Sequence, residues 1–155
     1  MQLRTWIITL GQERSVNKIV VADADALIAL SLEKDPNHDL AVTISGMLMK
    51  QGVTIIFPIT VFPEAVTTLK RAFNQPEKAH LINRQLQQGA FQIEYLNQEI
   101  INRACEIFDK AISKQNTLFD AIVAATAEKL AAQAIFSFDD WYPKLGLKLA
   151  DIPKQ

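Results

Sequence analysis

Short apolar runs alternate with longer amphipathic segments along most of this chain. Four of the runs have the length and composition of strands, and they cover residues 19–22, 53–57, 91–95 and 134–138. Helical segments are predicted between and after them, over residues 24–32, 36–49, 60–73, 76–88, 97–111 and 116–132. This alternation predicts an α/β fold, a three-layer α/β/α sandwich with a central, mainly parallel sheet, in which the last strand is expected to be central.

Residues 1–17 stand outside this pattern. Their one apolar stretch, Trp6–Leu10, is shorter than the roughly 7–15 apolar residues of a secretory signal. No run approaches the roughly 20 apolar residues that a membrane-spanning helix needs. We therefore expect an N-terminal extension, one domain over residues 18–155 and a cytoplasmic location.

The composition limits the kinds of binding site and reactive group that the chain can contain. With 155 residues, 49% of them hydrophobic, the chain can bury one sizeable core. A net charge of −1 provides no overall basic field, so a nucleic acid would have to be bound by a local patch. His38 and His80 have no second histidine or cysteine at ligand spacing, which argues against a zinc site. The single cysteine, Cys105, can form no internal disulfide, and its apolar neighbours predict a buried, unreactive thiol.

Four acidic residues lie where predicted strands and helices meet, and each has an ordinary structural explanation when taken alone. Asp23 suits the N-cap of the first helix, and Glu64 suits the positive first turn of another. Asp120 stands three residues after Thr117, at the spacing of a capping box. Asp139 follows the last strand and suits a turn.

Taken together, these four acids point to a metal site. Each stands at the carboxyl end of a strand or the amino end of a helix, and such ends meet at one edge of an α/β sandwich. Carboxylates about 4 Å apart would repel each other by roughly 4 kcal/mol per pair at an effective dielectric of 20, unless a cation neutralised them. Hard oxygen ligands without histidine or cysteine favour Mg²⁺ or Mn²⁺, ions that bind substrate phosphates directly. The pattern therefore predicts phosphoryl chemistry.

From about residue 18 to residue 149, the chain resembles the PIN-domain family and, within it, the VapC-like toxins of bacterial toxin–antitoxin pairs. The motifs that carry the resemblance are VADADALIAL (21–30), TVFPE (60–64), NTLFDAIVAATA (116–127) and SFDDWYPKLGL (137–147). Each motif is weak alone, but four of them in the right order are a fairly specific signal. The family's four acids fall on Asp23, Glu64, Asp120 and Asp139.

The resemblance implies a PIN-like fold and a metal-dependent endoribonuclease, in which those acids hold one or two divalent ions that activate water for attack on an RNA phosphodiester. It also implies a toxin that forms a homodimer and binds an antitoxin across the acidic edge. Two residues depart from the family pattern. Asp25 stands where relatives often carry serine, threonine or asparagine, and is a candidate extra ligand. Trp141 replaces an acid that many relatives have, which weakens a second metal site.

Phosphate contacts are expected from basic residues near the motifs. Lys70 and Arg71 follow Glu64 on its helix, and Lys144 and Lys148 follow Asp139. These side chains could equally belong to ordinary solvated surfaces.

Two other functions remain open on the sequence alone. The segment Val21–Asp25 imitates the D-x-D strand of a haloacid-dehalogenase-type phosphatase, in which Asp23 would be a nucleophile. That interpretation has Leu27 where threonine or valine is expected, and it gives no role to Glu64 or Asp120. The second alternative is a PIN-like interaction module without catalysis, in which the acids only cap helices.

Overall fold

A four-stranded sheet forms the centre of this computed structural model, which describes residues 18–153. The strands are β1 (Ile19–Ala22), β2 (Thr54–Pro58), β3 (Gln92–Glu94) and β4 (Ala134–Phe136). They are all parallel and lie in the order β3-β2-β1-β4. Within the described residues the helices are α1 (Ala24–Ser31), α2 (His38–Lys50), α3 (Val61–Arg71), α4 (Pro76–Gln87), α5 (Gln98–Asp109), α6 (Leu118–Lys129) and α7 (Trp141–Lys144).

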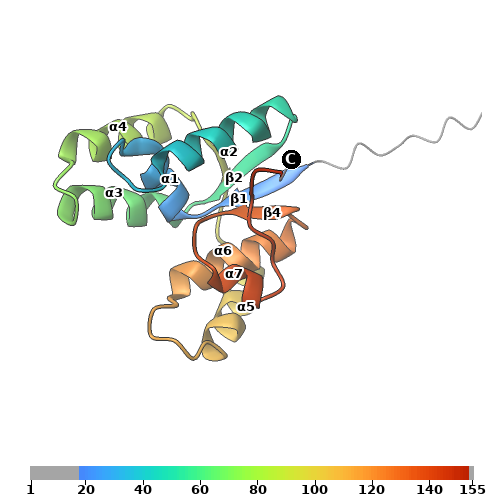
Figure 1. The fold of residues 1–155 in the computed structure, drawn as a ribbon. Helices are drawn as coiled ribbons and strands as arrows, with labels where there is room; N and C mark the ends of the chain where they lie inside the picture. The colour runs from blue at the N-terminus through green and yellow to red at the C-terminus, as the bar shows by residue number, and fades with distance from the viewer. Residues whose placement is uncertain (1–17, 154–155) are drawn as a thin grey trace, which may run out of the picture.

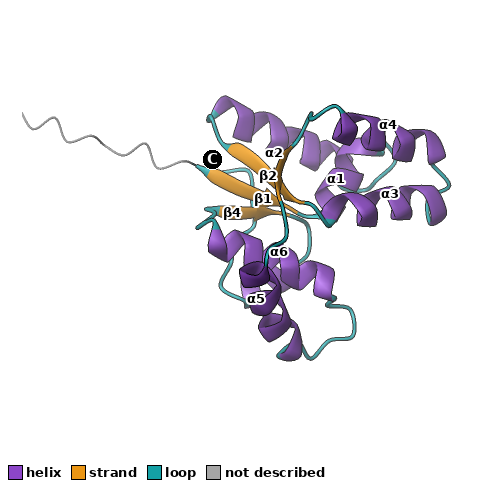
Figure 2. Cartoon of the chain, turned by 180° about the vertical axis from the view of Figure 1, so that it is seen from behind, coloured by secondary structure: helices purple, strands orange, loops and turns teal. Residues whose placement is uncertain are grey.

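The helices cover both faces of the sheet. Helices α1 to α4 lie on one side, and α5, α6 and α7 lie on the other (Figures 1 and 2). The predicted three-layer α/β/α sandwich is therefore confirmed, with every predicted strand and helix placed within a few residues of its expected bounds.

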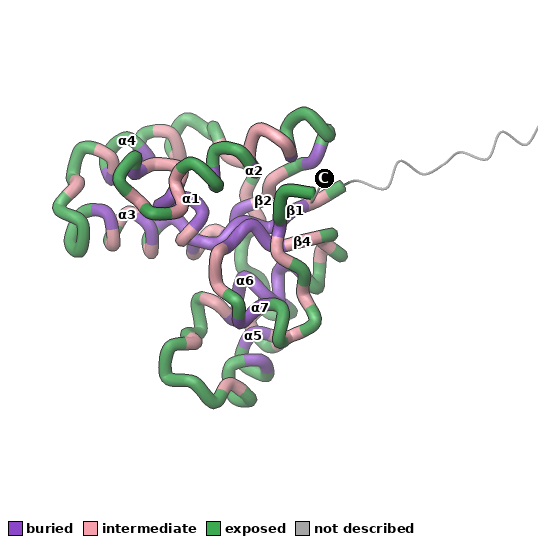
Figure 3. Tube along the Cα trace, viewed as in Figure 1, coloured by how far each residue is buried: buried purple, intermediate pink, exposed green. Residues whose placement is uncertain are grey.

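The core is centred on β1 and α6. Val20 and Val21 of β1 are fully buried because helices cover both faces of the strand, as Figure 3 shows along its central segment. Every residue of α6 from 121 to 127 is buried, four of them alanines. These small side chains let α6 approach the sheet closely, where it contacts β1, β2 and β4. The first turn of α6 is thereby held at the edge where the strands end.

Side-chain caps are present at three helices, among them the predicted caps of α1 and α6. The Asp23 carboxylate accepts a hydrogen bond from the Ala24 N–H at the start of α1. Asn97 accepts from the Ile100 N–H at the start of α5. Thr117 and Asp120 form the reciprocal capping box at the start of α6. Sequence-local geometry therefore fixes two of the four acids.

Two sequence expectations are wrong. Strand β4 is not central: it lies at the edge of the sheet, and its apolar residues are buried because the chain returns beside it, with a bridge between Ile135 and Leu149. Cys105 is exposed, because it lies outside the buried face that Ile100 and Ala104 form on α5. The expected extension over residues 1–17 lies outside the described residues. None of the helices in residues 18–153 is long and apolar enough to cross a membrane.

Candidate active site

All four predicted acids lie on one side of the molecule, where the strands end and helices begin. Asp23 joins β1 to α1, and Asp139 follows β4. Glu64 and Asp120 lie in the first turns of α3 and α6, which approach the same edge of the sheet from its two faces (Figure 1). The fold therefore brings together residues that are up to 116 positions apart in the sequence, from Asp23 to Asp139.

Asp23 is held on both of its carboxylate oxygens. Oδ1 accepts a hydrogen bond from the Ala24 N–H at 2.6 Å, and Oδ2 accepts one from the Tyr142 hydroxyl, also at 2.6 Å. The Ser137 hydroxyl lies 3.4 Å from Oδ2. Asp23 is only 4% exposed, and burial, followed by the charge of Asp25, raises its pKa well above the ordinary value.

Asp25 has one oxygen paired and one without a partner. Its Oδ2 accepts hydrogen bonds from the Ser137 hydroxyl and the Phe138 N–H, both at 2.8 Å. Its Oδ1 is buried and has no hydrogen-bond partner among the residues that the structure describes. Burial is the main cause that raises the pKa of Asp25, and the charge of Asp139 adds to it. An unpartnered buried carboxylate oxygen is costly unless a proton or a cation accompanies it.

Glu64 and Asp120 repel each other and their neighbours across the site. Burial and the charges of Asp120 and Asp25 raise the pKa of Glu64 to about 7. Burial also raises the pKa of Asp120, against the hydrogen bonds that its Oδ2 accepts from the Thr117 N–H at 2.7 Å and hydroxyl at 2.9 Å. These effects on pKa mean that the carboxylates lie close enough to repel one another.

Ser137 links the remaining acid to this group. Its hydroxyl donates to Asp25 and accepts a hydrogen bond of 3.1 Å from the Asp139 N–H. The Asp139 Oδ1 in turn accepts from the Trp141 N–H at 2.8 Å, and its charge raises the pKa of both Asp25 and Asp120. Five acids, rather than four, therefore form one electrostatically coupled cluster.

The donor set fits a hard divalent cation. It consists of carboxylates, it includes the unpartnered Oδ1 of Asp25, and the raised pKa values of Asp23 and Glu64 are ones that a cation would lower. Nearby, the buried hydroxyl of Thr60 at the start of α3 also lacks a partner among the described residues. Over residues 18–153, no three of the acids stand in a ready-made coordination shell. Side-chain rotation would have to draw the carboxylates together around an ion.

Sequence reasoning did not identify Tyr142 and Ser137 as parts of the site. Tyr142 is fully buried and hydrogen-bonds to Asp23, and Ser137 is 2% exposed and contacts three acids. The motif over residues 137–147 contains both, but nothing in it indicates that the Tyr142 hydroxyl contacts an acid. Of the two, only Ser137 could have been predicted from the sequence, because its hydroxyl directly follows a strand that ends at the acidic edge.

The four predicted basic residues are all exposed, but they are not gathered around the acids. Lys70 and Arg71 end α3, two turns beyond Glu64. Lys144 lies on α7, close to the loop that carries Asp139. Lys148 lies toward the opposite end of the sheet, where it lines a hollow with Val20 at the start of β1. Their role as phosphate contacts stays a prediction.

Comparison with known proteins gives a family and a set of similar folds. The model of the PIN domain matches residues 20–146. A crystal structure of VapC20 from Mycobacterium tuberculosis, a toxin that cleaves the sarcin-ricin loop, superimposes with a TM-score of 0.71 at 16% identity, covering 86% of this chain and 99% of that one. A toxin–antitoxin complex from Klebsiella pneumoniae gives a TM-score of 0.50 at 15% identity, covering 77% of this chain and 86% of that one. Among curated protein sequences, none matches this chain.

The two structural neighbours share the fold at low sequence identity, whereas the family model matches the sequence itself. That match begins in β1 and ends just beyond α7, so it includes all five acids of the cluster. It spans far more than half of the chain, and this chain therefore belongs to the PIN-domain family.

Proposed function

We propose that this protein is a Mg²⁺- or Mn²⁺-dependent endoribonuclease and the toxin of a type II toxin–antitoxin pair. The observation that carries the nuclease proposal is the cluster of mutually repelling carboxylates at one edge of the sheet, in which Glu64 has a pKa of about 7 and Asp25 has a buried oxygen without a partner. Membership of the PIN-domain family and the fold shared with a toxin that cleaves the sarcin-ricin loop support the same proposal.

Asp23, Glu64, Asp120 and Asp139 would hold the ion, with Asp25 as a fifth candidate. Four of the five are already oriented by hydrogen bonds, among them Asp23 by Tyr142 and the Ala24 N–H, and Asp120 by Thr117. A bound divalent ion would activate water and stabilise the leaving oxygen of a phosphodiester. Because ligands that are fixed in advance lose less freedom on binding, these contacts favour one arrangement of the carboxylates.

A pair of activity assays tests the proposed function. We expect cleavage of a structured RNA in the presence of Mn²⁺, no cleavage after chelation with EDTA, and no turnover of a generic phosphomonoester. Asp139→Asn should lower the cleavage rate by at least about 100-fold, since it removes one charged ligand. The matched control is Asp140→Asn, because Asp140 is the adjacent acid, is exposed and makes no side-chain capping bond.

The outcomes separate the three functions. Monoester turnover without RNA cleavage would support the phosphatase. No activity on either substrate would support an interaction module. RNA cleavage that survives both EDTA and Asp139→Asn would contradict a metal-dependent nuclease at this site.

If the protein is a toxin of this type, it should also have protein partners. We propose a homodimer that binds a small antitoxin, and the antitoxin would cover the acidic edge. The toxin–antitoxin complex whose fold this chain shares supports the antitoxin part of this proposal. An antitoxin that placed a basic side chain among the five carboxylates would relieve their repulsion, as a metal ion would.

Tyr142→Phe tests whether the buried hydroxyl orients Asp23. The variant removes one oxygen atom from a fully buried ring and leaves the apolar packing in place. We expect the Mn²⁺ concentration for half-maximal RNA cleavage to rise by about tenfold, the lower end of the effect of losing a partner that orients a metal ligand. The rate at saturating Mn²⁺ should change much less.

The control for this variant is Tyr95→Phe, because Tyr95 is 66% exposed and lies outside the cluster. A purely structural role for the Tyr142 hydroxyl would lower the melting temperature but leave the Mn²⁺ dependence unchanged. That combination would contradict the orienting role.

A further inference from the structure

A hollow beside the acidic cluster has no role in the proposed chemistry so far. It has a volume of about 390 Å³ and lies between the end of α5, the loop after it and α7. We call it the α7 hollow. The residues that line it include Lys110, Ile112, Asn116, Trp141, Lys144 and Leu145.

Two residues that line the α7 hollow hydrogen-bond to an acid of the cluster or are adjacent in sequence to a residue that does. The Trp141 N–H donates to the Asp139 carboxylate at 2.8 Å. Asn116 immediately precedes Thr117, whose N–H and hydroxyl hold Asp120. An RNA chain with one phosphate at the acids continues on both sides of that phosphate. The α7 hollow lies next to the acids on the side of α6 and α7, where one of these flanking nucleotides could bind.

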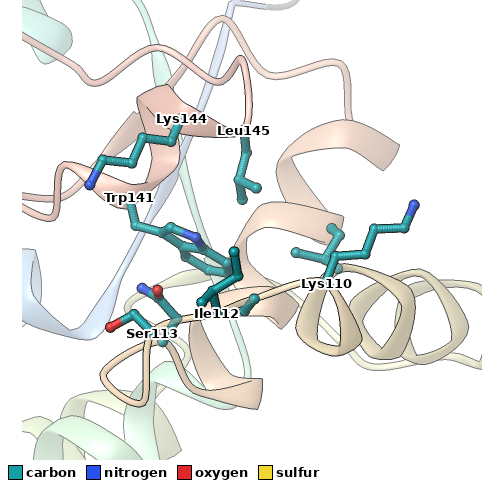
Figure 4. Close-up of a pocket in the computed structure, with 9 residues that line it drawn as sticks. Lys110, Ile112, Ser113, Trp141, Lys144 and Leu145 are labelled. Carbon is teal, nitrogen blue, oxygen red and sulfur yellow. The ribbon is translucent and has the colours of Figure 1, made fainter.

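The interior of the hollow is apolar and contains a flat ring. Trp141 is 8% exposed, and it lines the hollow together with Ile112 and Leu145 (Figure 4). The Ile112 side chain is fully exposed at the rim. An apolar hollow that contains an indole is suited to a nucleobase, since every base has an apolar π face.

The charged groups of the hollow are all positive. Lys110 and Lys144 extend from opposite sides of it (Figure 4), no acidic residue lines it, and neither lysine forms an ion pair within residues 18–153. A second hollow on α5 differs in this respect, because its Arg103 is paired with Glu128. Cations without a protein partner beside an apolar hollow favour an anionic ligand that carries flat apolar groups.

We propose that the α7 hollow binds a nucleotide next to the scissile phosphodiester of the RNA substrate, a proposal that rests on the proposed nuclease function. The base packs against Trp141, Ile112 and Leu145, and Lys110 and Lys144 contact the flanking phosphates. Asn116 also lines the hollow, and its amide would hydrogen-bond to the edge of the base. The hollow thus provides a base-binding subsite that the acids themselves lack.

The test measures RNA binding separately from cleavage. Binding of a fluorescently labelled oligoribonucleotide is measured in the Asp139→Asn background, and cleavage is measured in the otherwise wild-type chain. Lys110→Gln combined with Lys144→Gln should weaken binding by about tenfold at low salt and lower the dependence of log affinity on log salt by between about 1 and 2. Lys34→Gln combined with Lys50→Gln, two exposed lysines elsewhere on the surface, should leave both quantities unchanged.

A second variant tests the base contact. Ile112→Ser removes an exposed apolar side chain and should not disturb folding. We expect it to raise KM severalfold for an RNA with an intact base at the adjoining position, with little change in kcat. For the same RNA with an abasic site at that position, wild type and Ile112→Ser should have equal KM values.

The possible results distinguish the two levels of the proposal. RNA cleavage with unchanged binding and KM in all hollow variants overturns the subsite but leaves the nuclease intact. Absence of RNA binding and cleavage in the unmodified chain overturns both. If the hollow variants lose affinity for the proposed antitoxin while RNA binding is unchanged, the hollow is a protein-docking site and the RNA proposal is wrong.

Discussion

Asp23→Asn is expected to abolish RNA cleavage and, at the same time, to raise the melting temperature of the metal-free protein at pH 8. The loss of cleavage should be at least about 100-fold, because the variant removes the most buried charge of the proposed metal site. Stability should increase, in contrast to activity, because burial and the charges of Asp25 and Asp120 oppose ionisation of this carboxyl in the folded chain. We expect a rise of roughly 2–4 °C, the shift that about 1 kcal/mol produces in a domain of this size.

The pH dependence of this stability gain follows from the direction of the pKa shift. The pKa of Asp23 is raised in the folded state, so its contribution to stability is fully present below the ordinary value of 3.8 and is lost as pH rises. The advantage of Asp23→Asn should therefore be largest at alkaline pH and shrink as the pH approaches 4. Thermal melts in EDTA across that range measure it.

The control for Asp23→Asn is Asp39→Asn, an exposed acid in the first turn of α2. This substitution should lower stability by a few tenths of a kcal/mol through the helix dipole and leave cleavage unchanged. If Asp23→Asn were less stable than wild type at pH 8 in EDTA, the hydrogen bonds that Asp23 accepts would outweigh the repulsion, and the carboxylate would be structural.

The fold and the four acids could be predicted from sequence because their signals are local and repeated. Each strand ends at an acid or feeds a helix, and parallel strands end at the same edge, so residues such as Asp23 and Asp139 are brought together by topology alone. Thr117 and Asp120 lie three positions apart, and their capping box forms as the spacing predicts.

The supporting contacts could not be predicted, because they join positions that are far apart in the sequence. The Tyr142 hydroxyl reaches Asp23 across 119 positions, from a helix of only four residues that has too few turns to show a period. Ser137 reaches Asp25 across 112 positions. Each contact depends on where the chain passes after β4, and no periodicity specifies that path.

Proximity in sequence did not indicate where two further residues lie in the fold. Lys148 lies nine positions after Asp139, but the chain turns back and Leu149 pairs with Ile135, which carries Lys148 toward the amino end of β4. Cys105 has apolar neighbours along the chain, yet successive residues of a helix are about 100° apart, so they do not share a face with it. Local composition describes a residue's neighbours in sequence and not its surroundings in space.

The affinity for Mn²⁺ is expected to depend steeply on pH near neutrality. Glu64 has a pKa of about 7, and its proton must leave before the carboxylate can bind a cation. Its ionised fraction falls about tenfold between pH 8 and pH 6, so Mn²⁺ affinity should fall by at least about tenfold over that interval. The raised pKa values of Asp23, Asp25 and Asp120 act in the same direction and make the decline steeper. Calorimetric titration with Mn²⁺ at several pH values measures this dependence.

The Glu64→Gln variant measures how much this one carboxyl contributes to the pH dependence of Mn²⁺ affinity and of stability. The variant should bind Mn²⁺ more weakly at pH 8, but its affinity should fall less between pH 8 and pH 6, because one titrating ligand is gone. Without metal, the folded pKa of about 7 lies above the ordinary 4.5, so stability that is fully present below 4.5 is lost as pH rises through 7. Glu64→Gln should therefore be more stable than wild type at pH 8 in EDTA, by on the order of 1 kcal/mol after allowing for solvent screening of this half-buried group.

The matched control is Glu77→Gln, an exposed acid in the first turn of α4. It should keep the wild-type Mn²⁺ affinity and its full decline toward pH 6. If Mn²⁺ affinity were independent of pH in the wild-type chain, the carboxylates would already be ionised at pH 6, and the repulsion on which the metal proposal depends would be absent. If Glu64→Gln bound Mn²⁺ as wild type does at every pH, the ion would be held by the remaining acids alone. Glu64 would then be a neighbour of the site and not a ligand.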